Sequence, residues 1–580
     1  MIKLAEYLKH FKKQVILGPF FKFEEAVFEL IVPIVMAKII DNGVKLGDAP
    51  YVIKMGAVLF FLAVVGLLSA LICQYYAALA SQGVGTMLRN DLFSKINSFS
   101  NKEIDEFTTP SLVTRIINDV NQIQIAVALL IRLVVRAPFL VIGATIMAFI
   151  IDFKLSLIFI LVTPVIALIL YLIMKKSVPF YRGIQNKIDR LSKITRENLS
   201  GVRVIRAFSR QEKESERFNK ANDDLTKESV RAARISALLN PITYMIMNMA
   251  VLAILWFGGI RVDKGYMTQG EIIAFVNYAT QILLALVVVA NLIIVFTKAS
   301  ASASRINEVL ETEPSIREDE DVIISAKHDV PHPKIEFNNV SFCYDESDQK
   351  VLKDISFKIY KGQTVGIIGG TGSGKTTLVN LIVRFYDATS GQILIDGVDV
   401  SDYPVYALRK KVGVAMQNSV LFSGTVRYNM QFGNENAPDD KIYKALTTAQ
   451  ADEFVMKMDK GLDSLILQGG ANLSGGQRQR LNIARALVME PEILILDDST
   501  SALDFATDAA LRKALLKDTA DMTVIVVSQR ISSIKNADKI IVLDDGAVVG
   551  IGTHSELINE CDIYREICLS QMNDGRQNND

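Results

Sequence analysis

Six long apolar stretches fill the first 300 residues of this 580-residue chain. Each is close to the roughly 20 residues with which an α-helix crosses a hydrocarbon layer of about 30 Å. The stretches cover residues 15–40, 53–80, 126–150, 155–174, 238–260 and 271–297. The pattern therefore predicts six membrane-spanning helices within residues 1–300.

The connections between these stretches alternate in length. Short polar segments follow the first, third and fifth stretches, whereas long segments near 81–125 and 175–237 follow the second and fourth. The long segments have helical periodicity and are rich in Lys and Arg, which favours a cytoplasmic location for them and for the N-terminus. We expect the spans to continue beyond the bilayer as helices that turn at residues 108–110 and near Ser200-Gly201. The basic N-terminal segment lacks a small-residue cleavage site, so we interpret it as the lead-in to a retained helix.

The chain changes character after residue 300. Residues 301–334 become an acidic, proline-containing linker, and from 335 to 580 β-rich and helical segments alternate with Gly-rich turns. That alternation is typical of an α/β nucleotide-binding domain. The predicted fold is thus an α-helical membrane domain with long cytosolic extensions, followed by an α/β P-loop domain.

Composition agrees with a membrane half joined to a soluble half. The chain is 50% hydrophobic and 22% charged, with a mean hydropathy of +0.28. Its formal net charge is zero, so electrostatics gives no reason to expect a nucleic-acid partner. None of the four cysteines stands in a C-x-x-C pair, and we expect neither a disulfide framework nor a zinc site.

A phosphate-binding motif lies in "VGIIGGTGSGKTTLVNLI", residues 365–382. It matches G-x-x-x-x-G-K-[ST] between a β-run and a helical pattern, which is the context that the motif requires. Lys375 is expected to reach the β- and γ-phosphates, and the Thr376 hydroxyl to ligate Mg²⁺. The residues expected to bind ATP here are Gly369, Thr371, Gly372, Ser373, Gly374, Lys375, Thr376 and Thr377.

A second motif, "EILILDDS" at residues 492–499, ends an apolar run with two acids. Asp497 is placed to hold Mg²⁺, and Asp498 follows where a water-activating carboxylate is expected. The side chain of Asp498 is one methylene shorter than the glutamate usual at such a position. The sequence alone therefore leaves open whether this site hydrolyses ATP at a normal rate.

The segment "NLSGGQRQRLNIARAL", residues 472–487, makes the overall resemblance definite. With six predicted spans and one nucleotide domain, the whole chain resembles a half-transporter of the ATP-binding cassette (ABC) exporter family. It is most similar in pattern to the degenerate-site subunit of bacterial heterodimeric multidrug exporters. The resemblance implies that the signature residues cap the γ-phosphate of ATP held by another subunit. These residues are Ser474, Gly475, Gly476 and Gln477.

Other positions take their expected roles from the same resemblance. Tyr344 matches the aromatic residue that stacks on adenine. Gln417 matches the glutamine that touches Mg²⁺ and contacts the membrane domain. Asp504 ends a loop, residues 501–504, that crosses between subunits in the family.

Two positions depart from the family pattern. The catalytic glutamate is replaced by Asp498, and the switch histidine by Gln529. Shortening the base moves its oxygens by about 1 Å, a displacement that can cost on the order of 10²-fold in rate. Glutamine also cannot accept a proton as histidine does. With an intact signature, the two changes predict a subunit with a degenerate site that completes the competent site of a partner; a slow homodimer is the alternative.

The first span carries candidate substrate residues. Lys22, Glu25 and Glu29 share one helical stripe, and Glu24 lies beside it. Charges inside a membrane normally face protein or water and are functional candidates, so the stripe favours cationic amphipathic substrates. The alternative is a location near the cytosolic interface, with Lys22 paired to Glu25. The polar residues of the sixth span are weaker candidates for lining a cavity, and we expect most of them to make helix–helix hydrogen bonds. These residues are Asn277, Tyr278, Gln281 and Asn291.

The sequence thus predicts an ATP- and Mg²⁺-dependent exporter in a bacterial plasma membrane. The N-terminus and nucleotide-binding domain are expected in the cytoplasm, with a second ABC half-transporter as partner, membrane lipids around the helices, and drugs or other amphipathic compounds as cargo. Two alternatives remain: a homodimeric exporter of lipid, haem or peptide, and an ATP-gated membrane protein that does not pump. The intact signature argues against the second.

Overall fold

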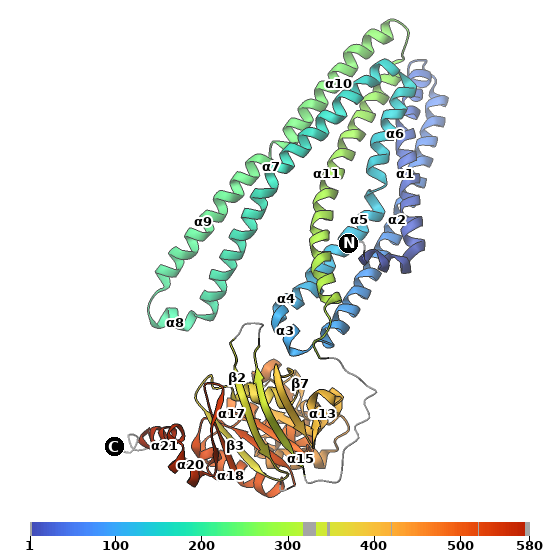
Figure 1. The fold of residues 1–580 in the computed structure, drawn as a ribbon. Helices are drawn as coiled ribbons and strands as arrows, with labels where there is room; N and C mark the ends of the chain where they lie inside the picture. Colours follow the sequence, from blue (N-terminus) through green and yellow to red (C-terminus); the bar gives the residue numbers. More distant parts are fainter. Residues whose placement is uncertain (1–2, 317–331, 345–348, 419, 520, 575–580) are drawn as a thin grey trace. The chain divides into compact units, whose positions relative to one another are not determined.

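The computed structural model describes residues 3–316, 332–344, 349–418, 420–519 and 521–574. The chain divides into two units (Figure 1). The first comprises Met1–Asn97 and Thr108–Thr312, and the second comprises Ser98–Phe107 and Glu313–Asp580. Of the predicted linker at 301–334, residues 317–331 lie outside the described residues.

The described residues of the first unit form helices joined by short turns. Its α-helices are α1 (Lys12–Lys38), α2 (Ala49–Asn97), α4 (Thr109–Thr114), α5 (Val120–Leu133), α6 (Arg136–Ile151), α7 (Phe153–Ser200), α8 (Val202–Ala207), α9 (Gln211–Ser236), α10 (Leu239–Asp263) and α11 (Gln269–Glu311). A 3₁₀ segment (Lys3–Phe11) precedes α1, and π-helical turns occupy Ile39–Val44 and Arg115–Asp119.

Three helices are longer than a bilayer is thick, as the sequence predicts. The helices α2, α7 and α11 have 49, 48 and 43 residues. At 1.5 Å per residue they are roughly 65–75 Å long, about twice the thickness of the hydrocarbon layer. Both predicted turns are confirmed, because Thr108 has a positive φ of 62° between α3 (Asn101–Phe107) and α4, and α7 ends before Gly201.

Among the described residues, five helical segments are long and apolar enough to cross a membrane. Four begin at Ala49, Thr109, Phe153 and Gln211, and the fifth is α11. The first predicted span is the helix α1, which packs between α2, α6 and α11 but carries four charged side chains in its central part. Those charges keep α1 out of the apolar set.

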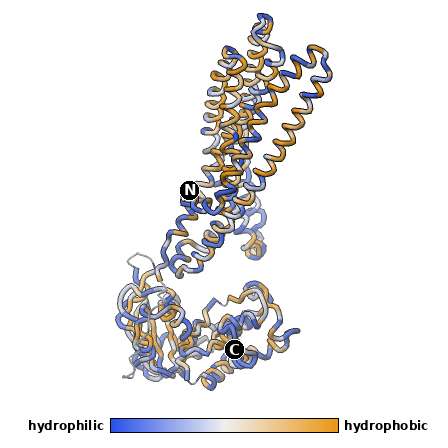
Figure 2. The backbone as a smooth tube through the Cα atoms, turned by 90° about the vertical axis from the view of Figure 1, so that its right-hand side faces the viewer, coloured by the Kyte–Doolittle hydropathy of each residue, from blue (hydrophilic) through white to orange (hydrophobic). Residues whose placement is uncertain are grey.

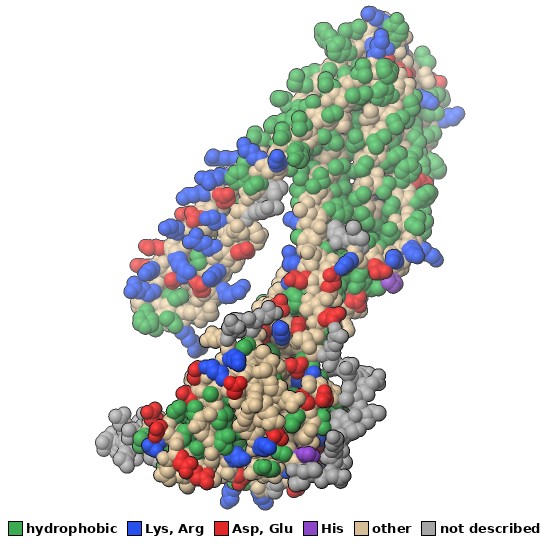
Figure 3. All heavy atoms as spheres, viewed as in Figure 1, with side chains coloured by type: hydrophobic (Ala, Val, Ile, Leu, Met, Phe, Trp, Pro, Cys, Tyr) green, Lys and Arg blue, Asp and Glu red, His purple; other side chains and the backbone are tan. Residues whose placement is uncertain are grey.

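Hydropathy is segregated along the helical unit. Apolar backbone segments run together through the bundle (Figure 2). Lys and Arg side chains gather over the far end of the hairpin that α7, α8 and α9 form, whereas hydrophobic side chains cover the other end of the unit (Figure 3). This distribution matches the predicted helices that extend from an apolar zone into a basic one.

The second unit has two main sheets. The four-stranded sheet has the order β2-β1-β4-β5 and is antiparallel. The six-stranded sheet has the order β12-β11-β3-β10-β9-β6, and all its pairs except β11–β12 are parallel. The strands are β1 (Ile335–Phe342), β2 (Leu352–Ile359), β3 (Thr364–Gly369), β4 (Ser390–Ile395), β5 (Val398–Asp399), β6 (Val412–Ala415), β9 (Ile493–Asp497), β10 (Thr523–Val527), β11 (Lys539–Asp544) and β12 (Ala547–Gly552), with a small pair β7 (Gly424–Thr425) and β8 (Leu465–Ile466).

Helices cover these sheets and complete the core. They are α12 (Lys375–Ile382), α13 (Val405–Lys411), α14 (Val426–Gln431), α15 (Asp439–Thr448), α16 (Asp452–Met456), α17 (Gly475–Val488), α18 (Phe505–Asp518), α19 (Ile531–Ile534), α20 (His554–Glu560) and α21 (Asp562–Asp574). The central parallel strands are apolar on both faces, and β9 is buried along its whole length.

The short helix α3 (Asn101–Phe107) belongs to the second unit although its sequence lies between α2 and α4. The Glu103 carboxylate accepts a hydrogen bond from Ser315 N at 3.0 Å, and Ser100 Oγ accepts one from Ile316 N at 3.0 Å. The helix at the first predicted turn is therefore fixed to the segment that leads into the nucleotide domain.

Candidate functional site

The predicted site residues collect at the carboxyl ends of four adjacent parallel strands. In the order β3, β10, β9, β6, these strands are followed by the P-loop, Gln529, Asp498 and Gln417. Ligands of open α/β sheets bind at this edge. A cavity of about 270 Å³ lies here, and its lining includes Thr371, Gly372, Gly374, Lys375, Thr376, Thr377, Gln417, Asp497, Asp498 and Gln529.

The P-loop needs its glycines for conformation and for space. Gly372 and Gly374 have positive φ values of 83° and 94°, which non-glycine residues rarely adopt. A Cβ on Gly369 would lie 2.1 Å from the carbonyl oxygen of Leu543. The Lys375 ammonium lies within the loop and donates to the carbonyls of Gly369 and Gly370 at 2.9 and 2.6 Å. Burial lowers the pKa of Lys375, and the charges of the nearby acids oppose that shift.

Asp497 ends β9 and faces the start of α12. It is 4% exposed, and the Thr376 hydroxyl lies 3.5 Å from its Oδ1. Burial raises the pKa of Asp497 above its usual value. Hard oxygen ligands of this kind suit Mg²⁺, which keeps several waters and substrate phosphates in its shell. Thr376 and Asp497 therefore fit a Mg²⁺ ion.

Asp498 follows in a left-handed conformation with φ 45°, which aspartate tolerates better than most side chains. Its Oδ2 lies 3.5 Å from Gln417 Nε2, and its backbone N–H donates to the Val527 carbonyl at 2.9 Å. Burial raises the pKa of Asp498, whereas the charge of Arg530 opposes this rise. The expected base, magnesium and switch residues thus line one cavity.

The signature segment adopts a capped helix start but does not line that cavity. Ser474 is the N-cap of α17: its hydroxyl accepts from Gln477 N at 3.3 Å, and Gln477 Oε1 accepts from Ser474 N at 2.9 Å. This capping box satisfies the N–H groups of Ser474 and Gln477, and Gly475 and Gly476 are half-buried. Among the described residues, the signature at 474–477 is not part of the lining of the P-loop cavity.

Tyr344 and Asp504 occupy defined local positions. The Tyr344 hydroxyl lies 3.0 Å from Thr377 Oγ1, and its ring packs edge-on against Tyr386 with centroids 5.1 Å apart. The Tyr386 hydroxyl in turn donates to the carboxylate of Asp105 on α3 at 2.5 Å. Asp504 is the N-cap of α18, and its carboxylate accepts from both N and Oγ1 of Thr507.

The sequence did not predict the roles of two residues near the site, Arg530 and Gln479. The Arg530 guanidinium donates to the Ser501 carbonyl at 2.9 Å, which joins the switch region to the loop at 501–504. Gln479 on α17 donates to Ser501 Oγ and accepts from Ala502 N, which fixes the signature helix to the same loop. Arg530 belongs to the segment 526–530 and Gln479 to the signature segment 472–487. Neither motif predicts a contact with the loop at 501–504.

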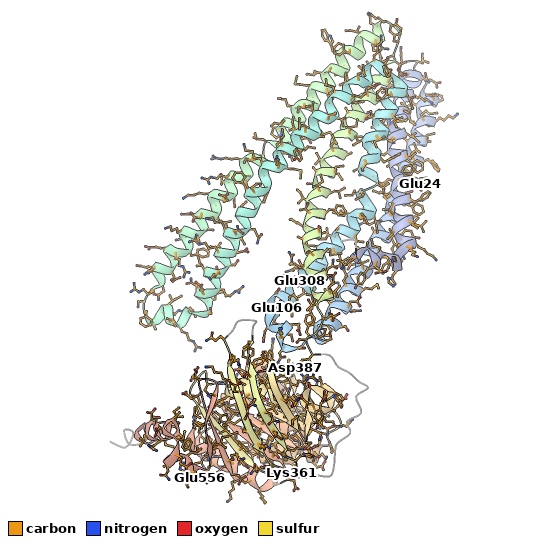
Figure 4. All side chains as sticks on the ribbon, viewed as in Figure 1. Glu24, Glu106, Glu308, Lys361, Asp387 and Glu556 are labelled. Carbon is orange, nitrogen blue, oxygen red and sulfur yellow. The ribbon has the colours of Figure 1, made fainter. Side chains whose placement is uncertain are left out.

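The acidic side chains of α1 all have partners in the helical unit. Glu24 lies midway along α1 (Figure 4) and accepts from Ser69 Oγ at 3.3 Å. Lys22 Nζ donates to both oxygens of Glu25 at 2.8 and 2.6 Å. Arg136 Nη2 donates to both oxygens of Glu29 at 3.0 and 2.8 Å. These contacts agree with the interpretation in which Lys22 is paired to Glu25, and the stripe is not a set of bare acids.

The polar side chains of α11 support the predicted helix–helix hydrogen bonds. Tyr278 Oη donates to the Leu30 carbonyl of α1 at 2.7 Å, and Gln281 Nε2 donates to the Glu29 carbonyl at 3.1 Å. Asn277 instead donates to the Ile273 carbonyl in its own helix. The prediction is confirmed for Tyr278 and Gln281.

Family models match both halves of the chain. The model for the ABC transporter transmembrane region matches residues 15–287, and the ABC transporter model matches residues 352–501.

Similar proteins extend over nearly the whole length. An uncharacterized ABC transporter ATP-binding protein of Bacillus subtilis (strain 168), YfiB, is 38% identical over 99% of both chains. An ATP-dependent lipid A-core flippase of Vibrio vulnificus (strain YJ016) is 31% identical over 95% of this chain and 94% of its own. A bacterial Atm1-family ABC exporter with ATP bound has the same fold, with a TM-score of 0.80 over 97% of this chain and 98% of that chain, at 23% identity.

Proposed function

The chain belongs to the ABC transporter family, and from this premise we propose that it forms one half of a heterodimeric exporter in a bacterial plasma membrane. It is a multi-pass membrane protein whose ATPase domain is coupled to transport. The proposal adds that ATP at this chain's P-loop is hydrolysed slowly, while the partner's site carries most of the turnover.

One observation carries the proposal. Asp498 and Gln529, the two residues that depart from the family pattern, both line the P-loop cavity. The intact signature at residues 474–477 lies outside it. A chain with altered residues in its own cavity and an intact signature to offer elsewhere is suited to completing another subunit's site.

The binding chemistry remains intact in this chain. Backbone N–H groups of the P-loop and of the start of α12 would bind the phosphates of ATP, and the Lys375 ammonium would neutralise their charge. Thr376 and Asp497 would hold Mg²⁺, with Gln417 nearby, and the bound ion supplies charge neutralisation on the phosphates. ATP is therefore expected to bind firmly at this site.

The hydrolytic chemistry is weakened at the same place. Asp498 would have to remove a proton from the attacking water, but its carboxylate is set back by one methylene and lies beside Gln417. Gln529 offers an amide donor to the γ-phosphate but accepts no proton. A long-lived ATP state is the expected result.

We also propose a topology for the membrane unit. We place six spans in residues 1–300, with α1 as the span whose charges are paired within the bundle. The basic end of the α7–α9 hairpin supports a cytoplasmic location for that end, for the N-terminus and for the nucleotide domain at 335–580 (Figure 3).

The cargo is proposed to be amphipathic or hydrophobic. A cavity of about 980 Å³ in the helical unit is lined by Val134 and by residues of α5, α6 and α11, most of them apolar. Among the described residues that line it, the polar side chains are those of Thr297, Ser300 and Ser304, and none is charged. This lining supports drugs or other amphipathic compounds and gives no preference for cations. The similarity to a lipid A-core flippase favours a lipid as the second candidate.

ATP turnover by the full-length chain tests the proposal. Purified alone, the chain should hydrolyse little ATP, and co-expression with a half-transporter that carries Glu and His at the equivalent positions should restore turnover. Robust hydrolysis by this chain alone, in a verified homodimer, would contradict the proposal. To test the cargo, ATPase stimulation by a panel of hydrophobic cations would be compared between the wild type and the double variant Glu25→Gln with Glu29→Gln, and we expect no difference. A loss of affinity in the double variant would show that the acidic residues of α1 bind cationic substrates.

A further inference from the structure

The C-terminal helix α21 reaches the switch loop through one glutamine. Gln571 Nε2 donates to the Gln529 carbonyl at 2.7 Å, and Gln571 Oε1 accepts from Ile531 N at 2.9 Å. A single side-chain amide thus holds the backbone on both sides of Arg530. The Gln529 carbonyl follows β10 and the Ile531 N–H begins α19, where regular secondary structure does not pair them. The Gln571 amide supplies their hydrogen-bond partners instead.

The helix that carries Gln571 is firmly seated. Tyr564 is fully buried and Cys568 is 4% exposed, and both pack with Ile531 and Ile534 in one apolar cluster. The Tyr564 hydroxyl also lies 2.8 Å from His554 Nδ1. Positions 564, 568 and 571 follow the i, i+4, i+7 spacing of one helix face. Gln571 therefore extends from the face that is anchored to the sheet.

The segment that Gln571 holds reaches both the P-loop cavity and the loop at 501–504. Gln529 lines the P-loop cavity together with Lys375 and Asp498. Arg530 donates to the Ser501 carbonyl. Because Gln571 fixes the backbone at residues 529 and 531, it also fixes the Cα positions from which the side chains of Gln529 and Arg530 extend.

We propose that Gln571 is a positioning residue that holds the switch loop in the conformation from which Gln529 meets the γ-phosphate of ATP. The inference rests on the proposed role of Gln529 at this chain's ATP site. It assigns the C-terminal helix a part in distinguishing ATP from ADP, because only ATP has the phosphate that this loop would meet. ADP lacks that phosphate, so we expect its binding to be independent of Gln571.

The test uses Gln571→Glu in the full-length chain reconstituted in lipid nanodiscs. The carboxylate keeps the size of the amide and still accepts from Ile531 N, but it repels the Gln529 carbonyl. At pH 8 we expect the Kd of ATP at this chain, read by competition with a photoreactive analogue that labels this chain, to rise about tenfold. The Kd of ADP should stay within twofold of the wild type.

Acidification supplies a second readout. A glutamic acid has an ordinary pKa of about 4.3, and the facing carbonyl raises it; the protonated form again donates to Gln529. The ATP defect of Gln571→Glu should therefore shrink as the pH falls from about 8 to about 5.5, relative to the wild type. Gln392→Glu, the same change at an exposed position on β4, is the matched control and should alter neither ligand. Gln571→Asn, which is too short to span both bonds, should give a smaller loss for ATP alone.

An equal loss of ATP and ADP affinity would show that Gln571 only supports the fold, and unchanged ATP affinity in both Gln571 variants would overturn the inference outright. Binding to this chain is measured directly, so its ATP hydrolysis rate, on which the proposed degenerate site depends, does not enter the result.

Discussion

Replacing Gln281 by leucine removes a hydrogen bond between two helices. The bond satisfies a carbonyl in α1 that a proline in that helix leaves without a donor. Pro33 lies inside α1 and has no backbone N–H, so the carbonyl four residues earlier, that of Glu29, lacks its usual helical donor. Gln281 Nε2 of α11 donates to that carbonyl at 3.1 Å. In an apolar bundle such a freed carbonyl must be satisfied from a neighbouring helix.

The structure sets the size of the effect. Leaving a buried carbonyl without a donor costs about 1–3 kcal/mol, while side-chain hydrogen bonds inside membranes average about 0.6 kcal/mol. Gln281 Oε1 is itself buried and has no hydrogen-bond partner among the described residues, so leucine also removes an unsatisfied acceptor. We therefore expect Gln281→Leu to lower the unfolding free energy of the helical unit by about 1 kcal/mol.

A second substitution isolates the cause. Pro33→Ala returns an N–H to α1, and in that background Gln281→Leu should cost close to nothing. The only tryptophan, Trp256, lies on α10, so its fluorescence during titration with a denaturing detergent reports on the helical unit. Asn277→Leu is the control, because Asn277 bonds within its own helix. An equal cost of Gln281→Leu in both backgrounds would refute this account of the contact.

Three further predictions concern the nucleotide domain. Asp498→Glu with Gln529→His should raise ATP hydrolysis at this chain's P-loop by about tenfold or more, and no gain would put the defect elsewhere, for instance in the partner's signature. Tyr386→Phe removes the donor to Asp105 and should lower dye transport per ATP hydrolysed by about fivefold, the factor for 1 kcal/mol; an unchanged ratio would exclude this bond from coupling. Because burial raises the pKa of Asp497, its contribution favours the folded domain at low pH and is lost as the pH rises through the folded value. Asp497→Asn should therefore raise the melting temperature of the nucleotide-free protein at pH 7 but not near pH 4, and an equal effect at both would contradict the burial argument.

The sequence was sufficient where a motif fixes local geometry. The P-loop required glycines at positive φ, and Gly372 and Gly374 have it. Apolar periodicity predicted the long helices and their turns, since a break such as Ser200-Gly201 is local.

Contacts between distant segments could not be read in the same way. Gln571 is 42 residues from Gln529, and no pattern links the two. In the sequence, Gln281 is one of several polar residues on a span. Only the packing of α11 on α1 shows that it donates to the Glu29 carbonyl, which Pro33 leaves without a helical donor. The acids of α1 gave a helical stripe, but Arg136, the partner of Glu29, comes from another helix. Pairing of this kind depends on tertiary structure, which periodicity does not encode.

The identity of the nucleotide on this chain after turnover tests the central claim most directly. The transporter would be isolated from its native membrane through a tag on this chain, incubated with a photoreactive, base-labelled ATP, irradiated during steady-state hydrolysis, and its chains separated before chromatography of the bound nucleotide. We predict mainly ATP on this chain and ADP on its partner. ADP on this chain, in the proportion found on the partner, would contradict a degenerate site built around Asp498 and Gln529.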